Sequence, residues 1–479
     1  MNVRSALPFR FDVEADLPPL HQLAHVHVLA IGGAGMSAVA RLLLDAGLTV
    51  SGSDAKDGPV LDDLRARGAR VAIGHDPRQV EGADTVVVSS AIREDNVELG
   101  AARAAGARVL HRSQALAVAM QDSRRVAVAG ANGKTTTSSM LTSALLHIGA
   151  APSFALGGEL AEQRTNAALG EGDDFVAEAD ESDGSFLVYH PHVAVVTNVQ
   201  PDHLDFYGDF ATVQAAYGEF ARTVRPGGLL VVCADDPGSA SLGERFRGES
   251  GDRTVVSYGF SDTADARLDE VTLEGHGGSA RLTVARRSYR LVLRVPGRHN
   301  LLNAAGAFLA ATQGCGHDPD RVLEGLAAFV GTRRRFEVRG EVDGITVVDD
   351  YAHNPGKVAA VVSTAAEIAR PGRLHVIFQP HLYSRTRDFA EDFARGLAAA
   401  DDVTLLEIYG AREDPVPGVT SELVAAGLRA AGRSVQVRSE ADALSHVVSN
   451  ARSGDIVMTV GAGDVTALAG TIVERLGAR

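Results

Sequence analysis

Residues 125–138 read RVAVAGANGKTTTS, and the rest of the chain is organised around this stretch. Val126, Val128 and their neighbours form a short apolar run that is typical of a buried parallel strand. Gly130 and Gly133 then end the strand, and the apolar residues that follow Lys134 recur at helical spacing. Strand, glycine turn and helix N-terminus together predict an anion site, because free backbone N–H groups and the helix dipole face the loop.

The side chains of this loop favour a nucleotide phosphate as the anion. Lys134 would place a point charge on the β- and γ-phosphates, and Thr135 would offer a hydroxyl to Mg²⁺. A complete Walker A pattern needs glycine at position 128, where this chain has Val128, so an ordinary glycine-containing turn is the alternative. The chain contains only three lysines, and one of them lies in this loop, which favours the phosphate site.

Composition limits the fold and the partners. A chain of 479 residues, 45% hydrophobic and 22% charged, is expected to form about two to four globular domains. The net charge of −15 argues against nucleic acid or an anionic membrane as a partner. Two cysteines give no disulfide framework. The chain shows neither a signal-peptide core nor an apolar run of about 18 residues, so we expect a cytoplasmic protein.

The residues before the phosphate loop contain a second nucleotide pattern. An apolar strand from His25 leads to Gly33 and Gly35, a helix follows, and a second strand ends at Asp54. This is close to the Rossmann fingerprint G-x-G-x-x-A, which binds a nucleotide diphosphate at a helix N-terminus and ribose hydroxyls at the acidic residue. The pattern alone does not identify the nucleotide, and a dinucleotide such as NAD is its commoner ligand. Two later strands end near Ser89 and His111. The loops at these strand ends either contact a ligand or only connect the strand to the next element.

The residues after the loop place acidic and imidazole groups at strand ends. A predicted strand leads into a carboxylate cluster formed by Glu178, Asp180, Glu181 and Asp183. Such a cluster is usually a solvated turn, but a strand end in a domain with a phosphate site favours a Mg²⁺ ligand. Another strand is followed by His203 between two aspartates. Asn300 and Asn303 lie at the start of a helix, where they either cap it or meet the nucleotide base.

The last third of the chain repeats the pattern of a short apolar strand followed by a polar loop. Four such units (residues 344–355, 373–389, 402–418 and 455–465) with helical segments between them predict a second Rossmann-like open sheet. The run GTRRRFEVRG from Gly331 is the densest basic run in the chain, and is either a solvated surface or a phosphate clamp. We therefore predict an α/β protein of three domains, comprising residues 1–122, 123–330 and 331–479.

Eight motifs, in this order, resemble those of the Mur ligase family: GGAGMS, GANGKTT, EADESD, TNVQPDHLD, GRHNLLNAAGA, DDYAHNP, FQPHLYSRTRD and GAGDV. The resemblance extends from about residue 25 to residue 470. It implies a Rossmann-like N-terminal domain that holds the UDP part of a sugar nucleotide rather than NAD. It also implies a central P-loop ATPase-type domain and a Rossmann-like C-terminal domain that binds the amino acid and closes on ATP.

The resemblance further implies an ATP-dependent ligase of peptidoglycan precursor synthesis, which joins L-alanine to the lactyl carboxylate of UDP-N-acetylmuramate. ATP would convert that carboxylate into an acyl phosphate, with Mg²⁺ as cofactor and ADP and phosphate as products. The expected partners are small molecules, without nucleic acid or membrane, and the expected state is a monomer or weak homodimer. The alternatives are a sister ligase that adds another amino acid or a recycled peptide, a non-catalytic regulator that binds ATP and UDP-sugar, and an NAD dehydrogenase.

Matching motif positions imply the site residues. The catalytic residues would be Lys134, Glu178 and His203, and the Mg²⁺ ligands Thr135, Glu178 and His203. ATP would contact Gly130, Asn132, Gly133, Lys134, Thr135, Thr136, Asn300, Arg335 and Asp350. The UDP-sugar would contact Gly33, Gly35, Met36, Asp54, Ser89 and His111. The amino acid would contact Tyr351, His353, His381 and Arg385.

The chain departs from the family pattern at three points. Leu382 stands where many relatives carry arginine, which leaves Arg385 as the expected carboxylate clamp and Arg387 as a weaker substitute. No lysine occurs between Lys134 and Lys357, so the carboxylated lysine that bridges metals in sister ligases is absent. Asn132 stands where many alanine-adding relatives carry histidine, so one polar capping side chain replaces another.

Overall fold

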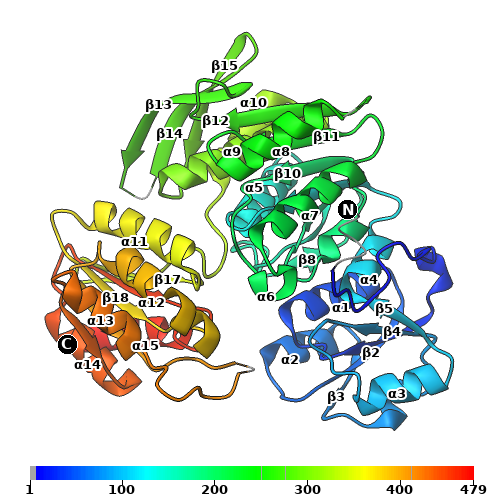
Figure 1. Ribbon diagram of the computed structural model, residues 1–479, viewed down its shortest axis with the longest axis horizontal. Helices are drawn as coiled ribbons and strands as arrows, with labels where there is room; N and C mark the ends of the chain where they lie inside the picture. Colours follow the sequence, from blue (N-terminus) through cyan, green and yellow to red (C-terminus); the bar gives the residue numbers. More distant parts are fainter. Residues whose placement is uncertain (1–6, 250, 276, 412) are drawn as a thin grey trace. The chain divides into compact units, whose positions relative to one another are not determined.

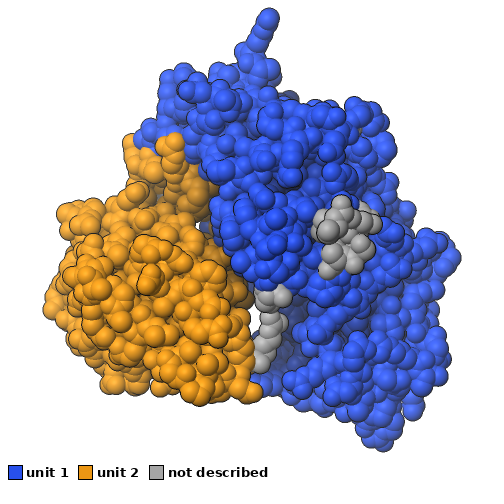
Figure 2. Space-filling model, viewed as in Figure 1, with its two compact units in different colours: residues 1–272, 278–294, 300–330 blue, residues 273–277, 295–299, 331–479 orange. Residues whose placement is uncertain are grey.

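The computed structural model describes residues 7–249, 251–275, 277–411 and 413–479, which form three sheets flanked by helices (Figure 1). The described residues thus confirm the predicted α/β class. The chain divides into two compact units, coloured separately in Figure 2. Unit 1 comprises residues 1–272, 278–294 and 300–330, and unit 2 comprises residues 273–277, 295–299 and 331–479. The domain boundaries at residues 122 and 330 stay a prediction. None of the described helices is long and apolar enough to cross a membrane.

The first sheet of unit 1 is parallel and has the order β3-β2-β1-β4-β5. Its strands are β1 (His25–Leu29), β2 (Thr49–Asp54), β3 (Arg70–Ile73), β4 (Thr85–Val88) and β5 (Arg108–His111). Its helices are α1 (Ala34–Asp45), α2 (Pro59–Ala66), α3 (Val97–Ala104) and α4 (Arg112–Ala119). The strand order reverses at β1 and β4, and ligands bind at the carboxyl ends of strands beside such a reversal.

The second sheet has ten strands in the order β15-β14-β13-β12-β11-β10-β6-β9-β7-β8. Its strands are β6 (Arg124–Ala129), β7 (Ser153–Ala155), β8 (Ala167–Ala168), β9 (Asp174–Glu178), β10 (Val193–Val196), β11 (Leu229–Cys233), β12 (Thr254–Gly259), β13 (Ala266–Glu274), β14 (Gly277–Val284) and β15 (Arg287–Leu293). Strand β6 lies between β10 and β9 and is parallel to both, so the phosphate loop leaves the sheet between two other strand ends.

The helices that accompany the second sheet are α5 (Lys134–His147), α6 (Leu204–Tyr207), α7 (Phe210–Thr223), α8 (Pro237–Arg247), α9 (Arg298–Leu309) and α10 (Pro319–Ala328). Helix α5 begins at Lys134, as the sequence predicts, and is buried around most of its circumference. One of its buried hydroxyls is satisfied within the helix, because Ser138 Oγ donates to the carbonyl of Lys134 at 2.9 Å.

The sheet of unit 2 has the order β16-β17-β21-β18-β19-β20, in which only the edge strand β16 is antiparallel. Its strands are β16 (Glu337–Val342), β17 (Ile345–Asp350), β18 (Leu374–Phe378), β19 (Asp402–Leu405), β20 (Val435–Val437) and β21 (Ile456–Val460). Its helices are α11 (Pro355–Ala369), α12 (Tyr383–Leu397), α13 (Glu422–Ala430), α14 (Glu440–Asn450) and α15 (Thr466–Gly477). Val347 and Val348 belong to different apolar cores, which shows that helices cover both faces of the sheet.

Candidate active site

The phosphate loop runs from the end of β6 to the first turn of α5, and its backbone requires glycine at both ends. Gly130 has φ +137° and Gly133 has φ +86°, conformations that only glycine adopts readily. A Cβ at Gly130 would also overlap the hydroxyl of Thr197, which follows β10. Gly133 is the N-cap of α5, so the first free N–H groups of the helix lie beside the loop.

The residues after β10 hold the loop in shape. Thr197 Oγ1 donates to the carbonyl of Asn132 at 2.6 Å. The amide of Asn198 bonds Asn132 twice, accepting from its N–H and donating to its carbonyl, each at 2.8 Å. The side chain of Asn132 itself donates to Gln200 Oε1 at 2.9 Å. The motif TNVQPDHLD was recognised in the sequence, but the hydrogen bonds by which Thr197 and Asn198 hold the loop were not predicted from it.

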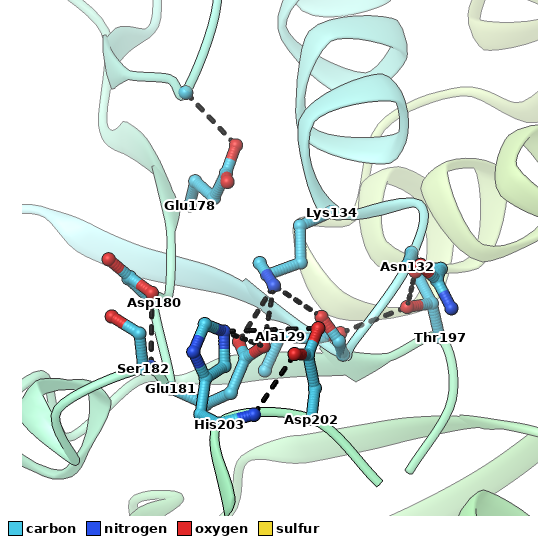
Figure 3. Close-up of polar contacts among 12 residues, drawn as sticks. Ala129, Asn132, Lys134, Glu178, Asp180, Glu181, Ser182, Thr197, Asp202 and His203 are labelled. Atoms are coloured by element: carbon cyan, nitrogen blue, oxygen red, sulfur yellow. Dashed lines mark hydrogen bonds and ion pairs between the residues drawn. The ribbon is translucent and has the colours of Figure 1, made fainter. Parts of the chain in front are cut away.

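Lys134 points back toward the loop and forms an ion pair with Glu181 (Figure 3). Its Nζ lies 2.8 Å from Glu181 Oε1, 2.7 Å from Oε2 and 2.5 Å from the carbonyl oxygen of Gly130. The side chains are 12% and 3% exposed. Burial opposes the charge of Lys134, but the carboxylates of Glu181, Glu178 and Asp180 together outweigh it and hold the pKa of Lys134 above its usual value.

Glu178 and His203, the two other predicted catalytic residues, lie close to this ion pair. Glu178 ends β9, and its Oε2 accepts the N–H of Gly157 at 2.9 Å. His203 lies before α6 with φ +52°, and its Nε2 is 3.9 Å from Glu181 Oε1 and 3.9 Å from Asp202 Oδ2. Figure 3 shows Lys134, Glu181 and His203 together at the ends of neighbouring strands.

The donor set suits Mg²⁺ better than a metal that needs a full protein cage. Thr135, Glu178 and His203 offer a hydroxyl, a carboxylate and an imidazole near the loop. In the part of the chain that the structure describes, no group of three His, Cys, Asp or Glu side chains could hold an ion. Mg²⁺ commonly takes one or two protein carboxylates and completes its shell with water and phosphate oxygens.

Asn300 and Asn303 bring α9 to the same loop. Asn303 Oδ1 accepts the hydroxyl of Thr137 at 3.2 Å, and a Cβ at Gly133 would meet the same oxygen at 2.7 Å. Asn303 Nδ2 in turn donates to Asn300 Oδ1 at 3.1 Å. Asn300 is therefore linked to the phosphate loop through Asn303, which packs on Gly133. Its contact with adenine stays a prediction.

The predicted UDP-sugar residues gather at the carboxyl end of the first sheet. Gly33 is the N-cap of α1, and Asp54 Oδ2 accepts the N–H of Gly32 at 2.9 Å, which holds the glycine turn. A Cβ at Gly35 would meet the guanidinium of Arg112 at 2.6 Å, so glycine there lets this cation lie over the N-terminus of α1. The side chain of Met36 faces the core, which leaves its backbone for a ligand.

Two polar links join this end of the first sheet to the acidic motif after β9. Arg112 Nη2 is 3.2 Å from Asp180 Oδ2. Burial works against the charge of Arg112, but Asp180 raises the pKa of that guanidinium. Ser90 Oγ donates to Asp183 Oδ2 at 2.6 Å and lies 3.1 Å from His111 Nε2. The two predicted nucleotide sites thus share a network within unit 1.

His111 and Ser89 line a cavity of about 370 Å³ under the N-terminal segment. Phe11 of that segment stacks on the His111 ring at 4.0 Å between ring centres. Burial lowers the pKa of His111 to about 4, so the ring is neutral at pH 7. Arg112 and Phe11 were not among the predicted residues. Arg112 directly follows His111 at the end of β5, which could have indicated it, whereas no feature of the sequence indicated Phe11.

In unit 2, the predicted ATP residues Arg335 and Asp350 lie at the end of β17. Asp350 accepts the N–H groups of Phe336 and Ala352, each at 2.7 Å, and burial raises the pKa of its carboxyl group. The guanidinium of Arg335 lies over the ring of Tyr351, 5.2 Å from its centre. Asp350 therefore holds the backbone at Phe336 and Ala352. Arg335 lies beside Tyr351, the first of the residues predicted to contact the amino acid.

The residues predicted to contact the amino acid form a cluster of rings. His353 lies 5.1 Å from the ring centre of Tyr351 and 5.8 Å from that of His381. His381 stacks on Tyr409, a residue that the sequence did not predict. Burial, followed by the charges of Lys357 and Arg385, lowers the pKa of His353 well below its usual value, which places Arg385 within electrostatic reach.

Comparisons with known proteins agree with this arrangement. Residues 25–124 match the model of the "Mur ligase family, catalytic domain", residues 128–311 the "Mur ligase middle domain", and residues 334–463 the "Mur ligase, glutamate ligase domain". A UDP-N-acetylmuramate–L-alanine ligase of Kineococcus radiotolerans is 52% identical, over 96% of this chain and 97% of that relative.

Two solved structures share the fold over 95% of this chain. One is a UDP-N-acetylmuramate–alanine ligase from Thermotoga maritima, with a TM-score of 0.80, 28% identity and 99% of its own chain covered. The other is a murein peptide ligase from Psychrobacter arcticus, with a TM-score of 0.70, 24% identity and 99% coverage. The three-domain α/β architecture predicted from the sequence is therefore confirmed.

Proposed function

The chain belongs to the Mur ligase family, and from this we propose that it is an ATP-dependent ligase that joins L-alanine to the lactyl carboxylate of UDP-N-acetylmuramate. This is an amide-forming step of peptidoglycan precursor synthesis, with ADP and phosphate as the other products. The observation that carries the proposal is the phosphate loop with its largely buried Lys134, in a chain similar throughout to ligases of that name.

The chemistry explains why such a loop is needed. A carboxylate is a poor electrophile, so one of its oxygens takes the γ-phosphoryl group of ATP and ADP leaves. The amine nitrogen then attacks the carbonyl carbon of the acyl phosphate, and the bond to the phosphorylated oxygen breaks, releasing phosphate. Phosphoryl transfer depends mainly on positioning and on neutralisation of charge, with little covalent chemistry for the protein.

The residues of unit 1 suit those tasks. The N–H groups at the start of α5 and the ammonium of Lys134 would bind the β- and γ-phosphates. Thr135, Glu178 and His203 would hold Mg²⁺, which neutralises charge on the phosphates when bound. These roles rest on the geometry of the loop and of the strand ends beside it.

The other two substrates would bind at the remaining clusters. Gly33, Gly35, Asp54, Ser89 and His111 would contact the UDP-sugar, and Arg112 would add positive charge at the same helix end. In unit 2, Tyr351, His353, His381 and Arg385 would contact L-alanine. Arg387 is exposed and paired with Asp388, so Arg385 is the better carboxylate clamp. We expect a cytoplasmic enzyme that is a monomer or a weak homodimer.

Phosphate release from ATP, measured with UDP-N-acetylmuramate and a panel of amino acids and peptides, tests this function. We expect release only when Mg²⁺, the UDP-sugar and an amino acid are all present, fast with L-alanine and weak with glycine or L-serine. A missing methyl or an added hydroxyl changes binding in a small pocket by only about 1–3 kcal/mol. Faster release with a peptide or another amino acid would assign the chain to a sister ligase, and no release would refute a catalytic role.

A further inference from the structure

Glu181 is a buried carboxylate at the reaction site for which the phosphoryl-transfer chemistry above has no role. Both of its oxygens contact Lys134 Nζ, at 2.8 Å and 2.7 Å, and its side chain is 3% exposed. An ammonium group has three N–H donors. Two are committed to Glu181, and the third is committed to the carbonyl oxygen of Gly130 at 2.5 Å. Lys134 therefore has to give up at least one of these contacts before it can donate to a phosphate.

The backbone around Glu181 keeps the carboxylate where it is. The hydroxyl of Tyr207 donates to the carbonyl of Glu181 at 2.5 Å, and the N–H of Gly184 donates to the same carbonyl at 3.0 Å. Lys134, in contrast, is a four-carbon chain with freely rotating donors. The exchange of partners would therefore be a movement of the lysine from a fixed carboxylate to the incoming phosphates.

We propose that Glu181 is the resident counter-ion of Lys134, which the phosphates of the incoming nucleotide displace, so that Glu181 sets the affinity and the selectivity of the loop for phosphate. The proposal rests on the proposed function, because it takes this loop as the ATP site. Without nucleotide, Glu181 is the carboxylate in direct contact with this largely buried ammonium group, on which the charges of Glu178 and Asp180 act as well. When nucleotide binds, the Glu181 carboxylate competes with the phosphates for the N–H donors of Lys134. Ligands with little negative charge therefore cannot displace Glu181 from Lys134.

The direct test compares nucleotide binding to the native chain and to Glu181→Gln. Glutamine keeps the size of the side chain but cannot pair with a cation as a carboxylate does. We expect the dissociation constants of ADP and of Mg²⁺-free ATP to fall about tenfold or more, which is the gain in affinity that one charge-assisted hydrogen bond gives. Adenosine, which has no phosphate, should bind with unchanged affinity.

Two further variants separate competition from general effects. Glu171→Gln removes an exposed negative charge from the loop before β9, so it controls for the change in net charge and should leave ADP affinity unchanged. Introduced into a Lys134→Ala background, Glu181→Gln should give no gain for ADP, because the lysine for which it competes is absent. A purely structural role would weaken the binding of adenosine and ADP alike.

Unchanged or weaker ADP binding by Glu181→Gln, or an equal gain in the Lys134→Ala background, overturns the proposal. If Glu181→Gln does not fold, Glu181→Asp decides, since its shorter carboxylate draws away from Nζ and should give a smaller gain for ADP and none for adenosine. Failure of the proposed function is recognised separately: the native chain would then release no phosphate from ATP with UDP-N-acetylmuramate and L-alanine.

Discussion

Replacing Lys134 by alanine is expected to abolish turnover and to destabilise the central part of unit 1. The substitution removes the only charge that the loop itself offers to the phosphates, and the loss of one preorganised group at a reacting centre lowers the rate by about 10²–10³. It also leaves Glu181, 3% exposed, without its cation. Removing one partner of a buried ion pair costs about 3–5 kcal/mol, which proton uptake by Glu181 would reduce. Binding of UDP-N-acetylmuramate should change little, because its predicted residues lie on the first sheet.

A second substitution separates the two effects. Lys134→Ala combined with Glu181→Gln removes the buried charge, so the double variant should regain much of the unfolding free energy while its turnover stays lost. Phosphate release, urea unfolding and calorimetric titration of the UDP-sugar measure the three quantities. Arg222→Ala on α7 is the matched control, since it removes an exposed cation paired with Glu249. Near-native turnover of Lys134→Ala, or its return in the double variant, would refute the assignment of the loop.

Three further predictions concern the metal, the amino acid and pH. Glu178→Gln should raise the Mg²⁺ concentration needed for half-maximal phosphate release, because an amide is a weaker ligand than a carboxylate; an unchanged Mg²⁺ titration would count against Glu178 as a ligand. Arg385→Lys keeps the charge but loses the bidentate fork, so the KM for L-alanine should rise much more than that for ATP, and a joint rise would move Arg385 to the nucleotide. Burial lowers the pKa of His111 to about 4, below its unfolded value of about 6.5. The unfolded chain then binds the extra proton first, so the free energy of unfolding should fall by up to about 3 kcal/mol as pH drops from about 6.5 to 4. His111→Gln should flatten that decline in urea unfolding, and an unaltered slope would contradict it.

The positions of strands and loops could be predicted from sequence because they depend on local patterns. Strand β2 ends at Asp54, β9 ends at Glu178 and α5 begins at Lys134, where apolar runs give way to glycine or charge. Parallel strands place their carboxyl ends at one edge of a sheet, so the sequence could also indicate which loops lie together.

Contacts between distant residues could not be read from those patterns. Glu178 ends β9 and three more carboxylates follow it, and nothing local shows that Glu181 rather than Glu178 contacts Lys134. The contact of Arg112 with Gly35 joins residues on different helices. In unit 2, β21 lies between β17 and β18, an order that the succession of strands along the chain does not reveal.

The central claim is that ATP activates the carboxylate of UDP-N-acetylmuramate by phosphorylating it. The most direct measurement uses UDP-N-acetylmuramate whose lactyl carboxylate carries heavy-isotope oxygen, with ATP, Mg²⁺ and L-alanine, and analyses the products by mass spectrometry. We predict one labelled oxygen in each phosphate released, because the amine displaces phosphate together with the oxygen that the carboxylate contributed. Phosphate without label, or amide formation accompanied by pyrophosphate, would contradict the account.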